Sequence, residues 1–274
     1  MIDKYGIKQF YPSTGREWFN TWDNNKSRTI LSKGTDKRNK DPYDKFSDLH
    51  CKSGDNGITT KAIIDGKGIC TLYGTTPRLY NNDPERKLKW FNVEMTVYFY
   101  IVKKLPKGGA YVACRLCGRS NHQNEYNCSA SGTGYSYETK NSNGTNQLRK
   151  ELGHPAYADD VKSETKGVEA GVWIGHKLIV KTQPDSDYVL VQGYRDLTDG
   201  KDGGDWKLMV ENIDKGNWKM TREEDLKSFK KIKSCKSFKK MSSTKAILDK
   251  PAISCYLRID SNEVRFKKYS IREI

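Results

Sequence analysis

The chain has 274 residues, which is enough for one large β domain or two small ones and enough to bury a core without disulfides or metals. Its formal net charge of +15 favours an anionic partner, namely an acidic polysaccharide, a nucleic acid or an anionic surface. No apolar run is long enough to span a membrane. The 16 tyrosines, 8 phenylalanines and 6 tryptophans suit either a β core or a surface that grips sugar rings.

The first 57 residues show no sustained period, and we expect them to form an irregular wrap at the start of a single domain, 1–274. The opening residues, Met1 to Gly6, are not a signal peptide. They fit a cytosolic or viral chain, or a mature chain that has lost its leader. We expect the last of these, an extracellular mature chain.

Strand patterns begin at residue 58. Residues 58–65 and 69–73 flank a turn with two glycines and predict a β-hairpin. Residues 90–102 give the clearest strand, because Asn92, Glu94 and Thr96 alternate with apolar residues. This alternation predicts one face against a core and one face turned away from it.

Three further strands are predicted within residues 111–152. In residues 111–119 the alternation directs Cys114 toward the core and Arg115 and Arg119 toward the opposite face. Residues 135–140 and 147–152 flank a turn rich in Asn and Gly and predict a second hairpin. The dipeptide His154-Pro155 ends the returning strand.

The rest of the chain also shows mainly strand patterns. We expect strands at residues 172–181, 188–195, 206–214, 253–260 and 263–274, with one short helical insertion near 220–232. Ten or so strands with little helix predict an all-β fold, an antiparallel β-sandwich. No internal repeat and no long linker divides it.

Several motifs together resemble a known superfamily. They are Trp90-x-Asn92-Val-Glu94, Gly118-Arg119-Ser120-x-His122, and Arg149-Lys150-Glu151-x-x-His154-Pro155. Segments 194–206 and 266–273 add to the likeness. The chain thereby resembles the concanavalin A-like lectin/glucanase superfamily over most of residues 60–274, in particular its polysaccharide lyases and related uncharacterised secreted proteins. The resemblance implies a concanavalin A-like jelly roll.

That superfamily contains hydrolases, lyases and non-catalytic lectins. Its hydrolases similar to laminarinases carry Glu-x-Asp-x-x-Glu on one strand, whereas Glu94 stands alone here. A retaining hydrolase needs two carboxyl groups about 5–5.5 Å apart, so this mechanism is disfavoured. The lyases of the fold use a cation or amide for the uronate carboxylate, a His or Tyr base, and a Tyr acid. The sequence therefore favours a lyase that cleaves an acidic polysaccharide by β-elimination.

The stretch 111–157 supplies the residues for this chemistry. A cation or amide must hold the carboxylate so that the charge developing beside it is stabilised. His122 or His154 is the expected base, since imidazole titrates near neutral pH, and Tyr135 or Tyr137 the expected acid. The expected substrate-binding residues are Arg115, Arg119, Asn121, Arg149, Lys150 and Glu151. If the 141–146 turn pairs the two strands, Tyr135, Tyr137, Arg149 and Glu151 can share one concave face.

Other readings stay open. The same aromatic and cationic residues would serve a non-catalytic carbohydrate-binding module, which needs no base. A glycoside hydrolase would use Glu94, Glu138 or Glu151 as its acid. A nucleic-acid partner is not expected, since no nucleic-acid-binding module is recognisable. In the structural reading, the charged residues form surface ion pairs and the tyrosines pack.

Two patterns bear on metals. Asp196, Asp199 and Asp202 recur among glycines and are candidates for a structural calcium ion, although a polar hairpin turn explains them equally well. Cys114 and Cys117 form a Cys-x-x-Cys, but strand alternation puts them on opposite faces, which argues against a shared zinc ion. No other cofactor is expected.

Overall fold

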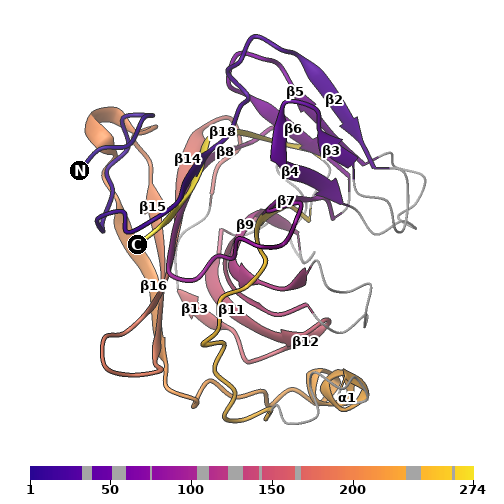
Figure 1. Ribbon diagram of the computed structural model, residues 1–274, viewed down its shortest axis with the longest axis vertical. Helices are drawn as coiled ribbons and strands as arrows, with labels where there is room; N and C mark the ends of the chain where they lie inside the picture. Colours follow the sequence, from indigo (N-terminus) through magenta and orange to yellow (C-terminus); the bar gives the residue numbers. More distant parts are fainter. Residues whose placement is uncertain are drawn as a thin grey trace.

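The computed structural model describes residues 1–32, 39–50, 60–74, 76–103, 111–122, 132–141, 144–163, 168–232, 242–260 and 263–274. The described strands form two antiparallel sheets that pack against each other around one large apolar core (Figure 1). This confirms the predicted all-β class and antiparallel sandwich.

The first sheet carries eight strands along its path and one more at its side. In spatial order these are β16 (Lys207–Asp214), β15 (Val189–Asp196), β14 (Trp173–Thr182), β8 (Val93–Ile101), β18 (Glu263–Glu273), β6 (Cys70–Tyr73), β5 (Lys61–Ile64) and β2 (Arg28–Leu31), with β1 (Glu17–Phe19) paired to β18. The predicted hairpin is β5–β6. The strand expected at 90–102 begins only at Val93, and Trp90 instead makes an isolated bridge to Ala252.

The second sheet has the same number of strands. In order these are β12 (Ala156–Tyr157), β11 (Asn146–Gly153), β10 (Gly134–Lys140), β9 (Val112–Ser120), β17 (Ser254–Arg258), β7 (Arg78–Asn82), β4 (Asp44–His50) and β3 (Asn39–Asp41), with β13 (Val161–Ser163) paired to β11. The predicted strands at 111–119, 135–140 and 147–152 are therefore confirmed as β9, β10 and β11. These three lie side by side in the sheet.

The core forms because alternate residues of each strand face the opposing sheet. On β8 these are Val93, Met95, Val97 and Phe99, and they join residues such as Leu116 of β9 in one buried cluster. Burying that apolar area is the main force that holds the sheets together. The intervening residues of each strand face away from the core, and on the second sheet they include charged residues such as Arg115 and Glu138 beside a small cluster of Tyr80, Cys117 and Tyr256.

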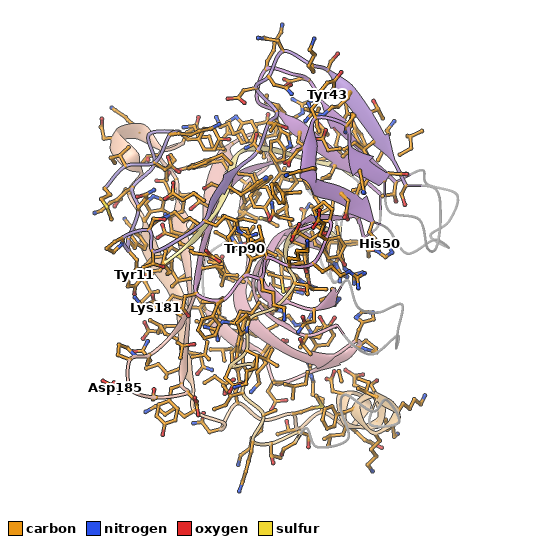
Figure 2. The ribbon with its side chains drawn as sticks, viewed as in Figure 1. Tyr11, Tyr43, His50, Trp90, Lys181 and Asp185 are labelled. Atoms are coloured by element: carbon orange, nitrogen blue, oxygen red, sulfur yellow. The ribbon has the colours of Figure 1, made fainter. Side chains whose placement is uncertain are left out.

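The N-terminal segment corrects one expectation. Residues 1–57 were expected to be irregular, yet they supply β1 and β2 to the first sheet and β3 and β4 to the second. Residues 1–13 do wrap the outer side of the first sheet. There the backbone N–H of Phe10 donates to Glu94, and Lys181 lies 4.2 Å from the Tyr11 ring centre (Figure 2).

Helix α1 (Glu223–Ile232) confirms the predicted helical insertion near 220–232. It packs its apolar residues Phe229 and Ile232 against Leu152 and Ala156 at the end of the second sheet. A short 3-10 turn, η2 (Lys201–Gly203), lies between β15 and β16. No helix in the described ranges is both long and apolar enough to cross a membrane.

Candidate functional site

The candidate site is the outer face of the second sheet, meaning the side turned away from the first sheet. Strand register aligns its side chains in two rows, because residues that pair across antiparallel strands point the same way. One row reads Gln147, Glu138, Arg115, Arg258, Arg78 and His50 from β11 to β4. The next row reads Arg149, Ser136, Cys117, Tyr256, Tyr80 and Asp48. Arginine, tyrosine and histidine thus gather on one face of the sheet, where most of them are buried.

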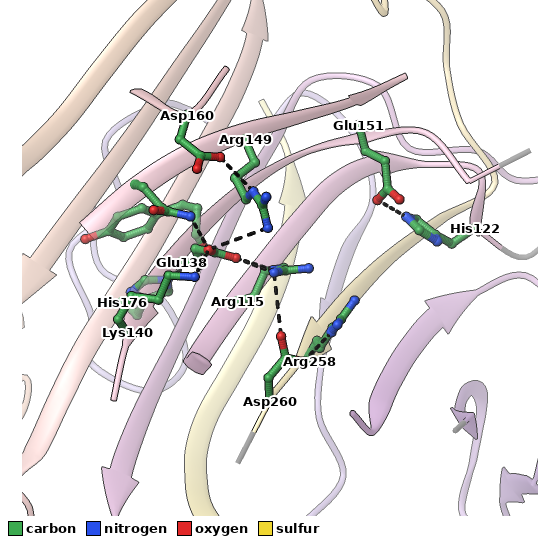
Figure 3. Close-up of polar contacts among 12 residues, drawn as sticks. Arg115, His122, Glu138, Lys140, Arg149, Glu151, Asp160, His176, Arg258 and Asp260 are labelled. Atoms are coloured by element: carbon green, nitrogen blue, oxygen red, sulfur yellow. Dashed lines mark hydrogen bonds and ion pairs between the residues drawn. The ribbon is translucent and has the colours of Figure 1, made fainter. Parts of the chain in front are cut away.

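An ion-pair cluster occupies the first row (Figure 3). Glu138 pairs with Arg115 at 2.5 Å and with Lys140 at 2.9 Å, and Arg149 lies 3.9 Å away. Burial alone would raise the pKa of Glu138, but the surrounding cations lower it to about 2. Glu138 is therefore a fixed anion at any physiological pH.

Two arginines at the margins of this cluster remain partly open to solvent. The side chain of Arg149 is 15% exposed, donates to Asp160 at 2.8 Å, and stacks 4.2 Å from the Tyr157 ring centre. Arg258 donates from Nε to Asp260 at 2.6 Å, while its buried Nη1 has no hydrogen-bond partner among the described residues. The Arg149 guanidinium can thus take a further acceptor, such as a carboxylate, whereas Nη1 of Arg258 is shielded from solvent.

A His–Glu–His cluster lies at the end of β9 and β11. The Glu151 carboxylate is hydrogen-bonded to His122 Nε2 at 2.6 Å and to His154 Nδ1 at 2.7 Å. Figure 3 shows the contact with His122. Burial alone would raise the pKa of Glu151, but the two histidines hold it well below its usual range. The His122 side chain is fully buried, whereas that of His154 is 23% exposed. His154 is the member that a ligand can reach.

Aromatic residues adjoin this cluster. The His122 ring meets the Tyr256 ring edge-on at 5.2 Å, and Tyr256 packs against Tyr80 at 5.4 Å. Tyr157 pairs with Glu151 across the β11–β12 ladder and is only partly buried. Burial raises the pKa of Tyr157 to about 12, so its hydroxyl keeps its proton at neutral pH.

The structure corrects the expected placement of the two tyrosines. Register aligns Arg149 with Ser136 and not with a tyrosine, so Tyr135 and Tyr137 point into the core. Tyr135 donates to Asp214 at 2.7 Å, and Tyr137 stacks on His176 with ring centres 3.9 Å apart. They do not share a face with Arg149 and Glu151.

Arg119 and Lys150 also have other partners than those expected. Lys150 points inward, is wholly buried and pairs with Asp214 at 2.9 Å. Arg119 has a left-handed backbone conformation, with φ +47°, which turns its side chain off the alternation of β9. Its guanidinium donates to the Phe91 and Leu248 carbonyls and to the side chains of Asn92 and Thr182.

The remaining candidates have structural partners. Asn121 bridges Thr133 and the backbone of Ile253. Glu94 lies on the first sheet, buried between Lys177 and Arg272. Asp196 accepts from Thr198, Gly200, Asp205 and Tyr98, which explains the Asp-rich loop as a hairpin turn. Asp199 pairs with Lys267, and Asp202 is exposed in η2, so calcium stays a prediction without a grouped set of ligands among the described residues.

Sequence reasoning missed Tyr157, Tyr256 and Arg258. Strand alternation could have found two of them, since Cys255 and Leu257 of β17 face the core and leave Tyr256 and Arg258 on the outer face. Their position beside Arg115 and Cys117 depends on β17 pairing with β9. That pairing joins residues more than 130 positions apart, and no local pattern encodes it.

No family model and no curated protein matches the chain. Solved structures similar to it include a candidate glycosyl hydrolase from Parabacteroides distasonis, at 16% identity and TM-score 0.38, covering 78% of this chain and 83% of that one. An alginate lyase from Chlorella virus has 7% identity and TM-score 0.37, covering 81% and 88%. The botulinum neurotoxin serotype D binding domain has 12% identity and TM-score 0.41. The match covers 91% of this chain and 49% of the neurotoxin chain. At such low identity, function has to be argued from the site itself.

Proposed function

We propose that the protein is a carbohydrate-active enzyme that cleaves a uronate-containing polysaccharide by β-elimination on the outer face of the second sheet. The observation that carries the proposal is the His154–Glu151 pair, in which a partly exposed imidazole is held at 2.7 Å by a buried carboxylate. When Nδ1 of a neutral His154 donates to Glu151, its Nε2 carries a lone pair and can accept a proton. A carboxylate that orients a histidine in this way is a common arrangement for a general base.

The reaction balances with groups on this face. His154 takes the proton from C5 of the uronate, the C4–O bond breaks, and a double bond forms between C4 and C5. Tyr157 gives its proton to the departing oxygen. Arg149, stacked on Tyr157 and 15% exposed, is the group to hold the uronate carboxylate while negative charge develops. Of the two expected bases, His154 is preferred because the side chain of His122 is fully buried.

Ultraviolet absorbance tests the proposal, because elimination creates a conjugated unsaturated uronate and hydrolysis does not. We expect absorbance to rise when the protein is mixed with one member of a panel of acidic polysaccharides. His154→Gln and Tyr157→Phe should each lower the rate by about 100-fold or more, the size expected for a lost general acid or base. Tyr100→Phe, a partly exposed tyrosine on the first sheet, is the matched control and should keep the rate.

A rise that survives both His154→Gln and Tyr157→Phe would contradict the assigned roles. New reducing ends without a rise in absorbance would point to hydrolysis instead. Hydrolysis is disfavoured here because a general acid needs a raised pKa, whereas the pKa values of Glu138 and Glu151 are both lowered.

A non-catalytic carbohydrate-binding module is the second candidate. One observation favours it: many charged groups on the outer face already pair with each other, such as Arg115 with Glu138 and Arg149 with Asp160. In that case the polysaccharide should retard the protein in an affinity gel without any rise in absorbance. His154→Gln should then leave the retardation unchanged, since binding needs no base.

A further inference from the structure

The His122, Glu151 and His154 side chains lie close enough to hold one ion. Their ligand atoms all lie within 4.8 Å of one another, and both imidazole nitrogens are within 2.7 Å of a Glu151 oxygen. His122 follows the end of β9, whereas Glu151 and His154 come from β11 and the residue after it. The three donors thus converge from two strands that flank β10.

The strand between them, β10, packs closely against β9 beside this cluster. Gly134 of β10 pairs directly with Glu151, and it carries no side chain. A Cβ atom at Gly134 would lie 2.6 Å from Cys117 Sγ, so the close packing here requires glycine. The His122 ring is fixed from the other side by its edge-on contact with Tyr256. The donors are therefore held in place by the fold.

The Glu151 carboxylate is shielded from solvent and is directed toward the two imidazoles. Glu151 is only 4% exposed, and its described ion pairs are with the two histidines. Arg149, two residues earlier on the same face, is directed to Asp160 and Glu138. The two carboxylate oxygens therefore face the two imidazole nitrogens, as the ligand atoms of one shared ion would.

We propose that His122, Glu151 and His154 form a binding site for a divalent transition-metal ion, with Zn²⁺ as the ion that this donor set suits. Two imidazole nitrogens and one carboxylate oxygen are the protein ligands of open zinc sites and of facial-triad iron sites. Calcium and magnesium prefer oxygen ligands throughout, so they fit less well. Zinc–nitrogen bonds of about 2.0–2.1 Å place two tetrahedral ligands about 3.3 Å apart. The contacts of Glu151 to the imidazole nitrogens, 2.6 and 2.7 Å, would therefore lengthen on metal binding, and the partly exposed His154 is the side chain that can shift.

This site is independent of the proposed elimination, but the two uses of His154 exclude each other. A metal ion on Nδ1 takes the lone pair there and leaves the proton on Nε2, where the base must have its own lone pair. The metal-free protein is then the form able to abstract a proton. If the chain is a lyase, bound Zn²⁺ inhibits it; if it is not, Zn²⁺ still binds.

Equilibrium dialysis of the full chain against Zn²⁺, without polysaccharide, is the first test. We expect one ion per chain at this site. Glu151→Gln and His154→Gln should each weaken binding by at least about 100-fold, the upper end of what loss of a supporting contact costs. His50→Gln, a histidine on β4 at the far end of the same face, should bind as the wild type does. A cooperative melt without Zn²⁺ shows whether each variant is folded, and a rise in melting temperature with Zn²⁺ reports binding.

Co²⁺ absorption then separates these ligands from the seven cysteines of the chain. Nitrogen and oxygen ligation gives only weak visible bands, whereas thiolate ligation adds intense charge-transfer absorption in the near ultraviolet. No stoichiometric binding, a thiolate signature, or affinity unchanged in folded Glu151→Gln would each overturn the metal site. None of these outcomes decides the elimination proposal, which is read by product absorbance in the absence of metal.

Discussion

Single charged residues on the outer face of the second sheet are buried to an extent that is rare for their types. Arg115 is 2% exposed and Glu138 is wholly buried, so each depends on the other for its charge balance. Breaking such a pair leaves an uncompensated buried charge, which costs more than the intact pair contributes. Residue-level changes here should therefore affect stability as well as any binding.

Stability of the fold should fall in acid because of Glu138. Its pKa is depressed from 4.5 to about 2, so its contribution is complete above pH 4.5 and is lost as the pH falls toward 2. The shift corresponds to roughly 3 kcal/mol. Urea unfolding at pH 7 should show Glu138→Gln to be less stable than the wild type by about that amount. The difference should shrink at pH 3, and an equal difference at both pH values would refute the assignment.

At the scale of elements, the two sheets are joined by a buried polar contact as well as by apolar packing. Asp214, at the end of β16, accepts from Tyr135 of β10 and pairs with Lys150 of β11. This contact connects the edge of the first sheet to the second sheet. It explains why Lys150 and Tyr135, which the sequence suggested as site residues, point into the core instead.

Asp214→Asn should therefore destabilise the chain by about 3 kcal/mol, because Lys150 would remain buried without a counter-charge. The double variant Asp214→Leu with Lys150→Met should recover much of that loss, since it removes both charges together. Thermal melts of the two variants compare them directly. If the loss of stability in the double variant equalled the sum of the losses from the two single substitutions, Asp214 and Lys150 would not be coupled.

Strand β15 of the first sheet packs against the aromatic ring of Tyr137, on β10 of the second sheet. Gly193 lies against Tyr137, and a side chain at this position would enter the Tyr137 ring. Gly193→Ala should cost about 1–3 kcal/mol through overpacking. Adding Tyr137→Leu should restore part of that stability by removing the clash, which denaturant unfolding of the three proteins can measure. No recovery would mean that the strain lies in the β15 backbone instead.

Over the whole molecule, the N-terminal residues complete the outer side of the first sheet while leaving the second sheet's outer face to the candidate site. The termini lie near each other beside the first sheet (Figure 1). Lys8 O accepts from Lys177, and the N–H of Phe10 donates to Glu94, so the wrap shields the Glu94–Lys177–Arg272 cluster from water.

Deleting residues 1–11 should lower the melting temperature, because each buried group left unsatisfied costs about 1–3 kcal/mol. Hydrogen exchange should accelerate on β8 and β14, whose outer sides the segment covers. Exchange on β10 and β11 should change little, which makes the second sheet an internal control. Equal acceleration in both sheets would show that the segment stabilises the whole sandwich and not one face.

The sequence by itself determined the class of the fold, the positions of most strands, a helix near 220–232, and the stretch that holds His122, Glu151 and His154. These depend on local properties, namely period-2 alternation, turn residues and spacing along the chain. The tertiary structure alone decided which candidates meet. Strand register sent Tyr135, Tyr137 and Lys150 into the core, one left-handed residue turned Arg119 aside, and the distant strand β17 brought Tyr256 and Arg258 to the outer face. A shift of one residue in register reverses every side chain of a strand, and register is set by pairing between strands far apart in the sequence.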